Sequence, residues 1–148
     1  MSEPLLPFPE PAPGPALPTL HVTNWSGKRW HGVGAKLGIM ASPRAWEQGD
    51  GRVPALQVPS RRLVQVKLGW VARADMLKAF EADLGAHRAD LAPGALRRAS
   101  LDLVQDGDTL CCCCSREDAE RRLCHRVAVA HALAASGWRV ILDGQQVR

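Results

Sequence analysis

The chain carries four consecutive cysteines at the end of a short apolar run, which predicts a buried strand over Thr109 to Cys114. Ser115 has the character of a helix cap, and the helical pattern that follows it extends to Gly137. Trp138 to Leu142 then predicts a further strand. A strand, a helix and a strand in this order form a βαβ unit, and such crossovers make parallel neighbours, so we expect the two strands to be adjacent and parallel in one sheet. All five cysteines lie on this unit.

The rest of the chain alternates between strand and helix patterns. Apolar and polar residues alternate along Leu20 to Trp25, which predicts a first strand, and Leu37 to Ala41 predicts a short second strand. Val64 to Val71 fits a strand or the start of a helix. Arg73 to Leu84 has helical periodicity with one apolar face, and Pro93 opens a short helix. Strands that alternate with helices indicate a mostly parallel α/β sheet.

We therefore predict one α/β domain over residues 19–148, with a small Rossmann-like sheet and flanking helices. Residues 1–18 contain seven of the eleven prolines. Proline fixes φ and removes a backbone donor, so this segment predicts a disordered or polyproline II arm. The arm is either a solvated tail or a proline-rich ligand for a partner protein.

Composition limits the classes of partner and compartment. The formal net charge of +4 suits an anionic partner but lacks the dense basic stripe that dominates non-specific DNA binding. No apolar run approaches the roughly 20 residues of a membrane span, and the N-terminus lacks a signal-peptide pattern. Clustered cysteines on one strand cannot easily pair with each other, which favours reduced thiols in a cytoplasmic protein. The sequence does not specify an oligomeric state.

Three interpretations of the cysteines remain open. Cys111 to Cys113 can be small buried hydrophobes of a core strand. Cys114, beside the predicted helix start, can be a reactive or ligand-binding thiol. Cys111 or Cys113 can bind zinc with Cys124 and His131. The last two residues are about 10.5 Å apart along a helix, too far to share one ion, so we predict neither a metal nor another cofactor.

The predicted helix also places its side chains. With the cap at Ser115, Cys124 lies about 13 Å along the helix and level with Leu110 or Cys111. His125 is expected to point away from the sheet, and Arg126 to lie on the flank opposite Cys124.

A second candidate site follows the first predicted strand. Asn24 and Trp25 end the strand, and Lys28 and Arg29 follow in a loop rich in glycine. Cations, an aromatic face and accessible backbone N–H groups suit a nucleotide or a single-stranded nucleic acid. The alternative is a surface loop held by packing of Trp25 and Trp30.

The C-terminal part of the sequence resembles a known family. Leu110-Cys111-Cys112-Cys113-Cys114, Cys124-His125-Arg126 and the final strand before Gly144 are similar to the C-terminal half of the bacterial domain-of-unknown-function 488 family. The resemblance covers roughly the last forty residues. The opening Gly-His-Ser and central Asp-Val-Arg of that family are absent here, and Thr23-Asn24-Trp25-Ser26 stands in place of the first. The resemblance implies a small cytoplasmic α/β protein and draws attention to the Cys-His-Arg triplet.

The leading hypothesis is a binding module for a phosphate-bearing ligand, either a nucleotide or a nucleic acid. Its predicted ligand-binding residues are Asn24, Trp25, Lys28, Arg29, Ser115, Arg116, Cys124, His125 and Arg126. One alternative is a thiol-dependent group-transfer or sulfur-transfer enzyme, with Cys114 as nucleophile and Arg116 as anion clamp. The other alternative is an interaction scaffold that uses the proline-rich arm. The sequence leaves open whether the protein is an enzyme.

Overall fold

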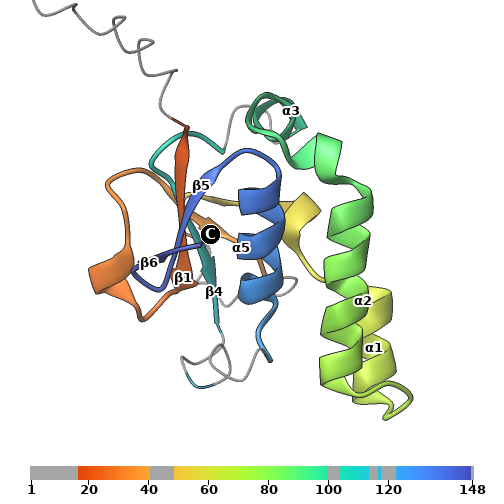
Figure 1. The fold of residues 1–148 in the computed structure, drawn as a ribbon. Helices are drawn as coiled ribbons and strands as arrows, with labels where there is room; N and C mark the ends of the chain where they lie inside the picture. Colours follow the sequence, from red (N-terminus) through yellow and green to blue (C-terminus); the bar gives the residue numbers. More distant parts are fainter. Residues whose placement is uncertain (1–16, 41–48, 100–103, 114–116, 118–122, 148) are drawn as a thin grey trace, which may run out of the picture.

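The computed structural model describes residues 17–40, 49–99, 104–113, 117 and 123–147. Within these residues six strands form one sheet in the order β3-β2-β4-β1-β5-β6, of which β1, β4, β5 and β6 are labelled in Figure 1. Their bounds are β1 (Thr19–Asn24), β2 (Lys36–Gly38), β3 (Gly51–Arg52), β4 (Thr109–Cys112), β5 (Arg139–Leu142) and β6 (Gln145–Gln146). The first five strands pair in parallel, and β6 pairs antiparallel with β5. The predicted α/β class and the mostly parallel sheet are confirmed.

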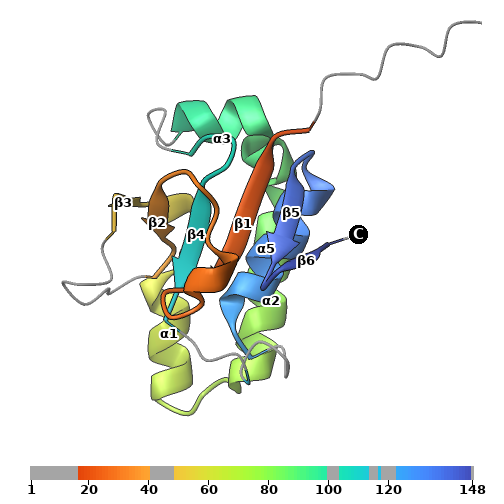
Figure 2. The same cartoon turned by 90° about the vertical axis from the view of Figure 1, so that its left-hand side faces the viewer.

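The α-helices cover one face of the sheet. They are α1 (Ser60–Lys67), α2 (Arg73–Ala86), α3 (Pro93–Ala99) and α5 (His125–Ala135), with short 3-10 helices η1 (Lys28–Trp30), η3 (Pro54–Leu56) and η4 (Arg88–Leu91). Figure 2 shows the connection from β1 to β2, which contains η1, in front of the sheet and the helices behind it. The segment whose pattern fitted both a strand and a helix is helical in its first part, because α1 extends to Lys67.

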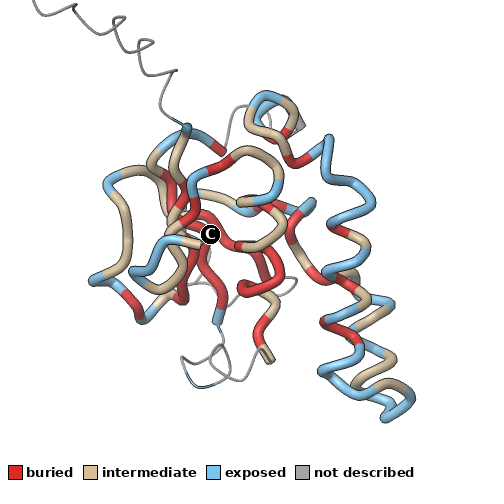
Figure 3. The backbone as a smooth tube through the Cα atoms, viewed as in Figure 1, coloured by how far each residue is buried: buried red, intermediate tan, exposed pale blue. Residues whose placement is uncertain are grey.

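Helix α5 lies between the sheet and α2, and its sequence explains this position. Valine, alanine and leucine surround the helix almost completely, and such a helix is stable only when it is covered on several sides. Its buried residues include Val127, Val129 and Leu133. The burial pattern in Figure 3 shows red along α5 and the central strands, and pale blue at the far end of the α1–α2 pair.

Helix α2 buries the predicted apolar face. Met76, Leu77, Phe80 and Leu84 are all buried in the core. At about 25 cal/mol per Å² of apolar area, burial of each such side chain contributes on the order of 2 kcal/mol. α2 therefore forms the outer layer that closes the core over α5.

The two strands of the βαβ unit are parallel but are not neighbours. β1 lies between them and pairs in parallel with β4 on one side and with β5 on the other. A helix is about 10 Å across, close to the width of two strand spacings, so a helical crossover spans an intervening strand easily. The prediction of adjacent strands was therefore wrong, while their parallel direction was correct.

The helix predicted from Ser115 to Gly137 is interrupted at Leu123 and Cys124, although Glu117 before this break is helical. Cys124 has extended backbone angles of φ −112° and ψ 133° and serves as the N-cap of α5, and Leu123 is also non-helical. The predicted continuous helix through Leu123 is therefore wrong. Because α5 starts at His125, Cys124 and the two residues after it lie beside the ends of the strands.

Some predictions concern residues that the structure does not describe. The proline-rich arm up to residue 16 and the predicted cap at Ser115 lie outside the described residues. Among the residues that the structure describes, no helix is long and apolar enough to cross a membrane.

Candidate functional site

A buried arginine occupies the carboxyl edge of the sheet. Arg126, in the first turn of α5, has a fully buried side chain. Its Nε and Nη2 donate to Oδ2 of Asp143 at 3.4 and 3.2 Å, and Asp143 directly follows β5. Thr23 of β1 donates from its hydroxyl to the other carboxylate oxygen at 2.8 Å. The carboxylate therefore links β1, the end of β5 and the start of α5.

Two sulfur atoms hold the other end of the guanidinium. Nη1 of Arg126 donates to Sγ of Cys112 at 3.2 Å and to Sγ of Cys124 at 3.4 Å. The two sulfurs are themselves 3.3 Å apart. The backbone N–H of Arg126 also donates to the Cys124 sulfur at 3.5 Å, which makes this sulfur the side-chain cap of α5. We call Cys112, Cys124, Arg126 and Asp143 the arginine–thiol cluster.

The electrostatics of this cluster keep the arginine charged. Burial alone lowers the pKa of Arg126, but the sulfurs of Cys112 and Cys124 and the Asp143 carboxylate raise it by more. A guanidinium that is fully buried and held by three side chains does not bind an external anion directly. Arg126, predicted as a ligand-binding residue on the helix flank opposite Cys124, instead contacts the Cys124 sulfur and is buried at the sheet edge.

Cys111 lies in a different environment from its neighbour in sequence. Successive side chains of a strand point to opposite faces, so Cys111 faces the β1–β2 connection while Cys112 faces α5. Its sulfur is 3.9 Å from Nε2 of His31, and the same imidazole nitrogen donates to the carbonyl of Asn24 at 3.1 Å. Burial raises the pKa of Cys111 to about 12, although Lys36 acts in the opposite direction. Cys111 is therefore an unreactive thiol.

The predicted cationic loop lies on the face opposite α5. Lys28 and Arg29 are exposed in η1, and the Arg29 guanidinium lies 4.2 Å from the ring centroid of Trp30. Trp25 packs so closely against Gly49 that a Cβ there would lie 2.5 Å from the indole ring. Its indole N–H is buried and has no acceptor among the described residues. These contacts support the alternative in which the tryptophans pin the loop.

A pocket opens at the carboxyl edge between the sheet and the α1–α2 pair. We call it the edge pocket; its volume is about 380 Å³. It is lined by Ile39, Met40, Val58, Leu63, Val66, Lys67, Arg73, Met76, Leu77, Cys113 and His125. The lining is mainly apolar, with two cationic side chains, one exposed thiol and one imidazole.

His125 is the first residue of α5 and reaches the edge pocket from the helix N-terminus. Its Nε2 donates to the carbonyl of Ile39 at 2.7 Å, and its ring meets Phe80 edge-to-face at 6.3 Å. The expectation that His125 points away from the sheet was wrong, because the late start of α5 turns its side chain toward the end of β2. Cys113 and His125 consequently line the same pocket.

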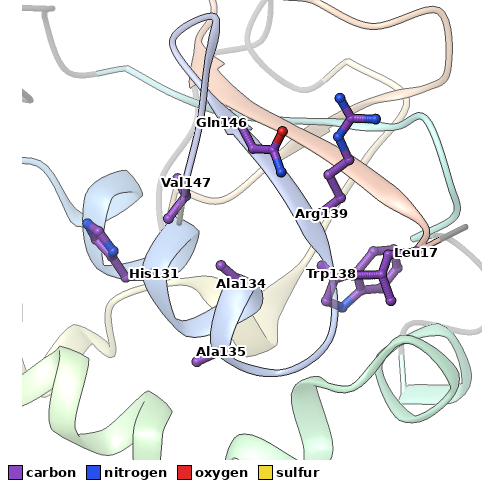
Figure 4. Close-up of a pocket in the computed structure, with 8 residues that line it drawn as sticks. All are labelled: Leu17, His131, Ala134, Ala135, Trp138, Arg139, Gln146 and Val147. Carbon is purple, nitrogen blue, oxygen red and sulfur yellow. The ribbon is translucent and has the colours of Figure 1, made fainter.

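A larger pocket, of about 690 Å³, lies elsewhere, beside the last turns of α5 and the start of β5 (Figure 4). Leu17 and Trp138 close one side of it, and His131 lies on the other (Figure 4). None of the predicted ligand-binding residues lines it, and of the candidate zinc ligands it contains His131. Volume alone therefore does not identify the functional site.

The structure separates the predicted ligand-binding residues into groups. Cys124 and Arg126 belong to the arginine–thiol cluster, and Asn24 is buried at the end of β1. His125 lines the edge pocket. Lys28, Arg29 and Trp25 lie on the opposite side, and Cys114, Ser115 and Arg116 lie outside the described residues.

Sequence reasoning missed Asp143, Lys67 and Arg73. Asp143 could have been noticed, because an Asp-Gly pair that ends a predicted strand marks a turn at the sheet edge. The two cations carry no such signal, since exposed Lys and Arg are common on helices.

The structure separates two of the candidate zinc ligands, Cys111 and Cys124. Cys111 lies on the opposite face from Cys124, and it is Cys112 that meets Cys124. Among the described residues, no group of three or more histidine, cysteine, aspartate or glutamate side chains could hold a metal ion. The prediction that the protein contains no zinc remains to be tested by elemental analysis.

Comparison with known proteins identifies no relative: no family model, no curated protein and no solved structure matches the chain. The resemblance to the domain-of-unknown-function 488 family therefore stays a prediction.

Proposed function

We propose that the protein binds a small phosphate-bearing ligand, a nucleotide, in the edge pocket. The observation that carries this proposal is the position of the pocket at the carboxyl ends of β2 and β4 and at the N-terminus of α5. Open α/β sheets bind ligands outside the carboxyl ends of their strands, and a helix N-terminus favours an anion.

The lining of the pocket suits the two parts of a nucleotide. Met40, Met76 and Leu77 offer apolar surface for a base. Lys67 and Arg73, both exposed on the α1 and α2 walls, supply positive charge for a phosphate. The volume of about 380 Å³ falls within the usual range of small-molecule sites.

Ligand screening tests the proposal. A nucleoside mono-, di- or triphosphate at millimolar concentration should raise the melting temperature by mass action, and the effect should weaken with added salt. Arg73→Ala and Lys67→Ala should each weaken binding about 10-fold, in line with the loss of one charge-assisted contact of about 1.4 kcal/mol.

Arg29→Ala is the matched control, because Arg29 is also an exposed arginine but does not line the edge pocket. It should leave the affinity unchanged. Loss of binding in Arg29→Ala with full binding in Arg73→Ala would move the site to η1 and refute the pocket. Absence of any nucleotide effect on the melting temperature would refute nucleotide binding itself.

A thiol-dependent transfer enzyme is the second candidate, favoured by the presence of Cys113 and His125 in one pocket. A thiol and an imidazole are two of the groups that nucleophilic cysteine catalysis uses. Cys114 remains the predicted nucleophile. Rapid alkylation at pH 6 that disappears in Cys114→Ser or Cys113→Ser would support this activity, and uniformly slow alkylation would refute it.

A further inference from the structure

The arginine–thiol cluster contains two thiols in contact that the proposed ligand site does not use. Cys112 ends β4 and Cys124 caps α5, and they are twelve positions apart in the sequence. Both are buried, with 0% and 1% of their surfaces exposed, and both are thiols rather than a disulfide. We propose that Cys112 and Cys124 are a redox-active pair that a small oxidant of the peroxide or disulfide class converts to a disulfide.

The geometry places the two sulfurs close to bonding distance. Their separation of 3.3 Å must shorten by about 1.2 Å to reach a disulfide bond of about 2.05 Å. They come from two different elements, so the new bond would tie the end of β4 to the start of α5. The contact of 3.3 Å therefore leaves a movement of only about 1 Å between the two sulfurs.

The charge around the pair favours oxidation over metal binding. The Arg126 guanidinium lies 3.2 and 3.4 Å from the two sulfurs and repels a metal cation at that position. The same guanidinium supplies a counter-charge for a thiolate, which is the nucleophilic form of cysteine. A soft metal ion is therefore a poor occupant, while an electrophilic oxidant is a suitable one.

Access distinguishes the two sulfurs. Cys124 lines a pocket of about 260 Å³ between α2 and α5, whose wall includes Lys78 and Glu81. Cys112 is 0% exposed and, among the described residues, lines neither this pocket nor the two larger ones. A small oxidant reaches Cys124 first, so Cys124 is the attacking thiol and Cys112 the resolving one.

The chemistry balances with a disulfide oxidant such as oxidised glutathione. The Cys124 thiolate attacks one sulfur, the S–S bond of glutathione breaks, and one glutathione thiolate leaves and takes up a proton. The Cys112 thiol then loses its proton and attacks the Cys124 sulfur, and the second glutathione thiolate leaves. The protein loses two electrons and two protons, and one oxidised glutathione becomes two reduced molecules.

The test uses the full chain with Cys111→Ala, Cys113→Ser and Cys114→Ser, which retains only the pair. After incubation with oxidised glutathione and acid quenching, mass spectrometry should show loss of two hydrogens and a Cys112–Cys124 cross-link. Adding Cys112→Ala should instead leave one glutathione on Cys124, whereas adding Cys124→Ala should leave Cys112 unmodified.

The wild-type chain provides the readout if the multiple variant does not fold. Its oxidised form, mapped by tandem fragmentation after proteolysis, should contain the Cys112–Cys124 bond, and Arg126→Met should slow its formation at least 10-fold. Oxidation that yields only intermolecular disulfides, or cross-links that exclude Cys124, would overturn the proposal. This result is independent of nucleotide binding, because neither sulfur lines the edge pocket.

Discussion

Replacement of Asp143 by asparagine should destabilise the protein strongly, because it leaves the buried Arg126 guanidinium without its carboxylate. Asparagine keeps the shape of the side chain and tolerates the positive φ of 46° at this position. It retains an amide oxygen as an acceptor but removes the negative charge. The substitution therefore isolates the electrostatic contribution of the pair.

The burial of the Arg126–Asp143 pair sets the size of the expected loss in the free energy of unfolding. Removing one partner of a fully buried ion pair costs about 3–5 kcal/mol. Here Arg126 is 0% exposed but the Asp143 side chain is 17% exposed, so water compensates part of the loss. We expect the free energy of unfolding to fall by about 2–4 kcal/mol, measured by urea denaturation with linear extrapolation.

Asp83→Asn is the matched control for this measurement. Asp83 pairs with Arg62 at 2.6 Å between α1 and α2, but the side chains are 42% and 21% exposed. An exposed pair contributes at most about 1 kcal/mol. Equal losses in Asp143→Asn and Asp83→Asn would refute the argument that burial of Arg126 sets the cost. Adding Arg126→Met to Asp143→Asn should recover part of the stability, since no buried charge then remains.

Three further outcomes are expected. Gly144→Ala should lower the free energy of unfolding, measured by urea denaturation, by about 2 kcal/mol or more, because φ is +83° and a Cβ would lie 2.6 Å from the indole ring of Trp30. Gly85→Ala is the control: a Cβ there meets nothing within 4 Å, so this variant should be neutral or stabilising by up to about 1 kcal/mol. Burial and nearby cations lower the pKa of His21, so its folded form resists protonation. The contribution of neutral His21 to the free energy of unfolding is therefore fully present above the pKa of the unfolded chain, near 6.5, and is lost as the pH drops below it. His21→Gln should make the urea midpoint less dependent on pH between pH 7.5 and pH 5. Native alkylation at pH 8 should label Cys113 before Cys111, whose pKa is about 12, and equal labelling would contradict the burial of Cys111.

Local pattern was sufficient for most of the elements. The strands at Thr19–Asn24 and Arg139–Leu142 and the apolar face of α2 follow from periodicity within a few residues. The parallel direction of β4 and β5 follows from the intervening helix, because a crossover connection returns the chain to the same edge.

The site depended on contacts that no local pattern records. The hydroxyl of Thr23 meets Asp143 across 120 positions, and Cys112 meets Cys124 only because α5 starts at the sheet edge. The sequence by itself determined most of the segments that form strands and helices, since those choices depend on neighbours in the chain, but it did not determine the break before α5. The tertiary structure decided that β1 separates β4 from β5, and that Arg126 is buried between sulfur and carboxylate. The physical reason is that a buried charge must find its partners wherever the packed elements bring them.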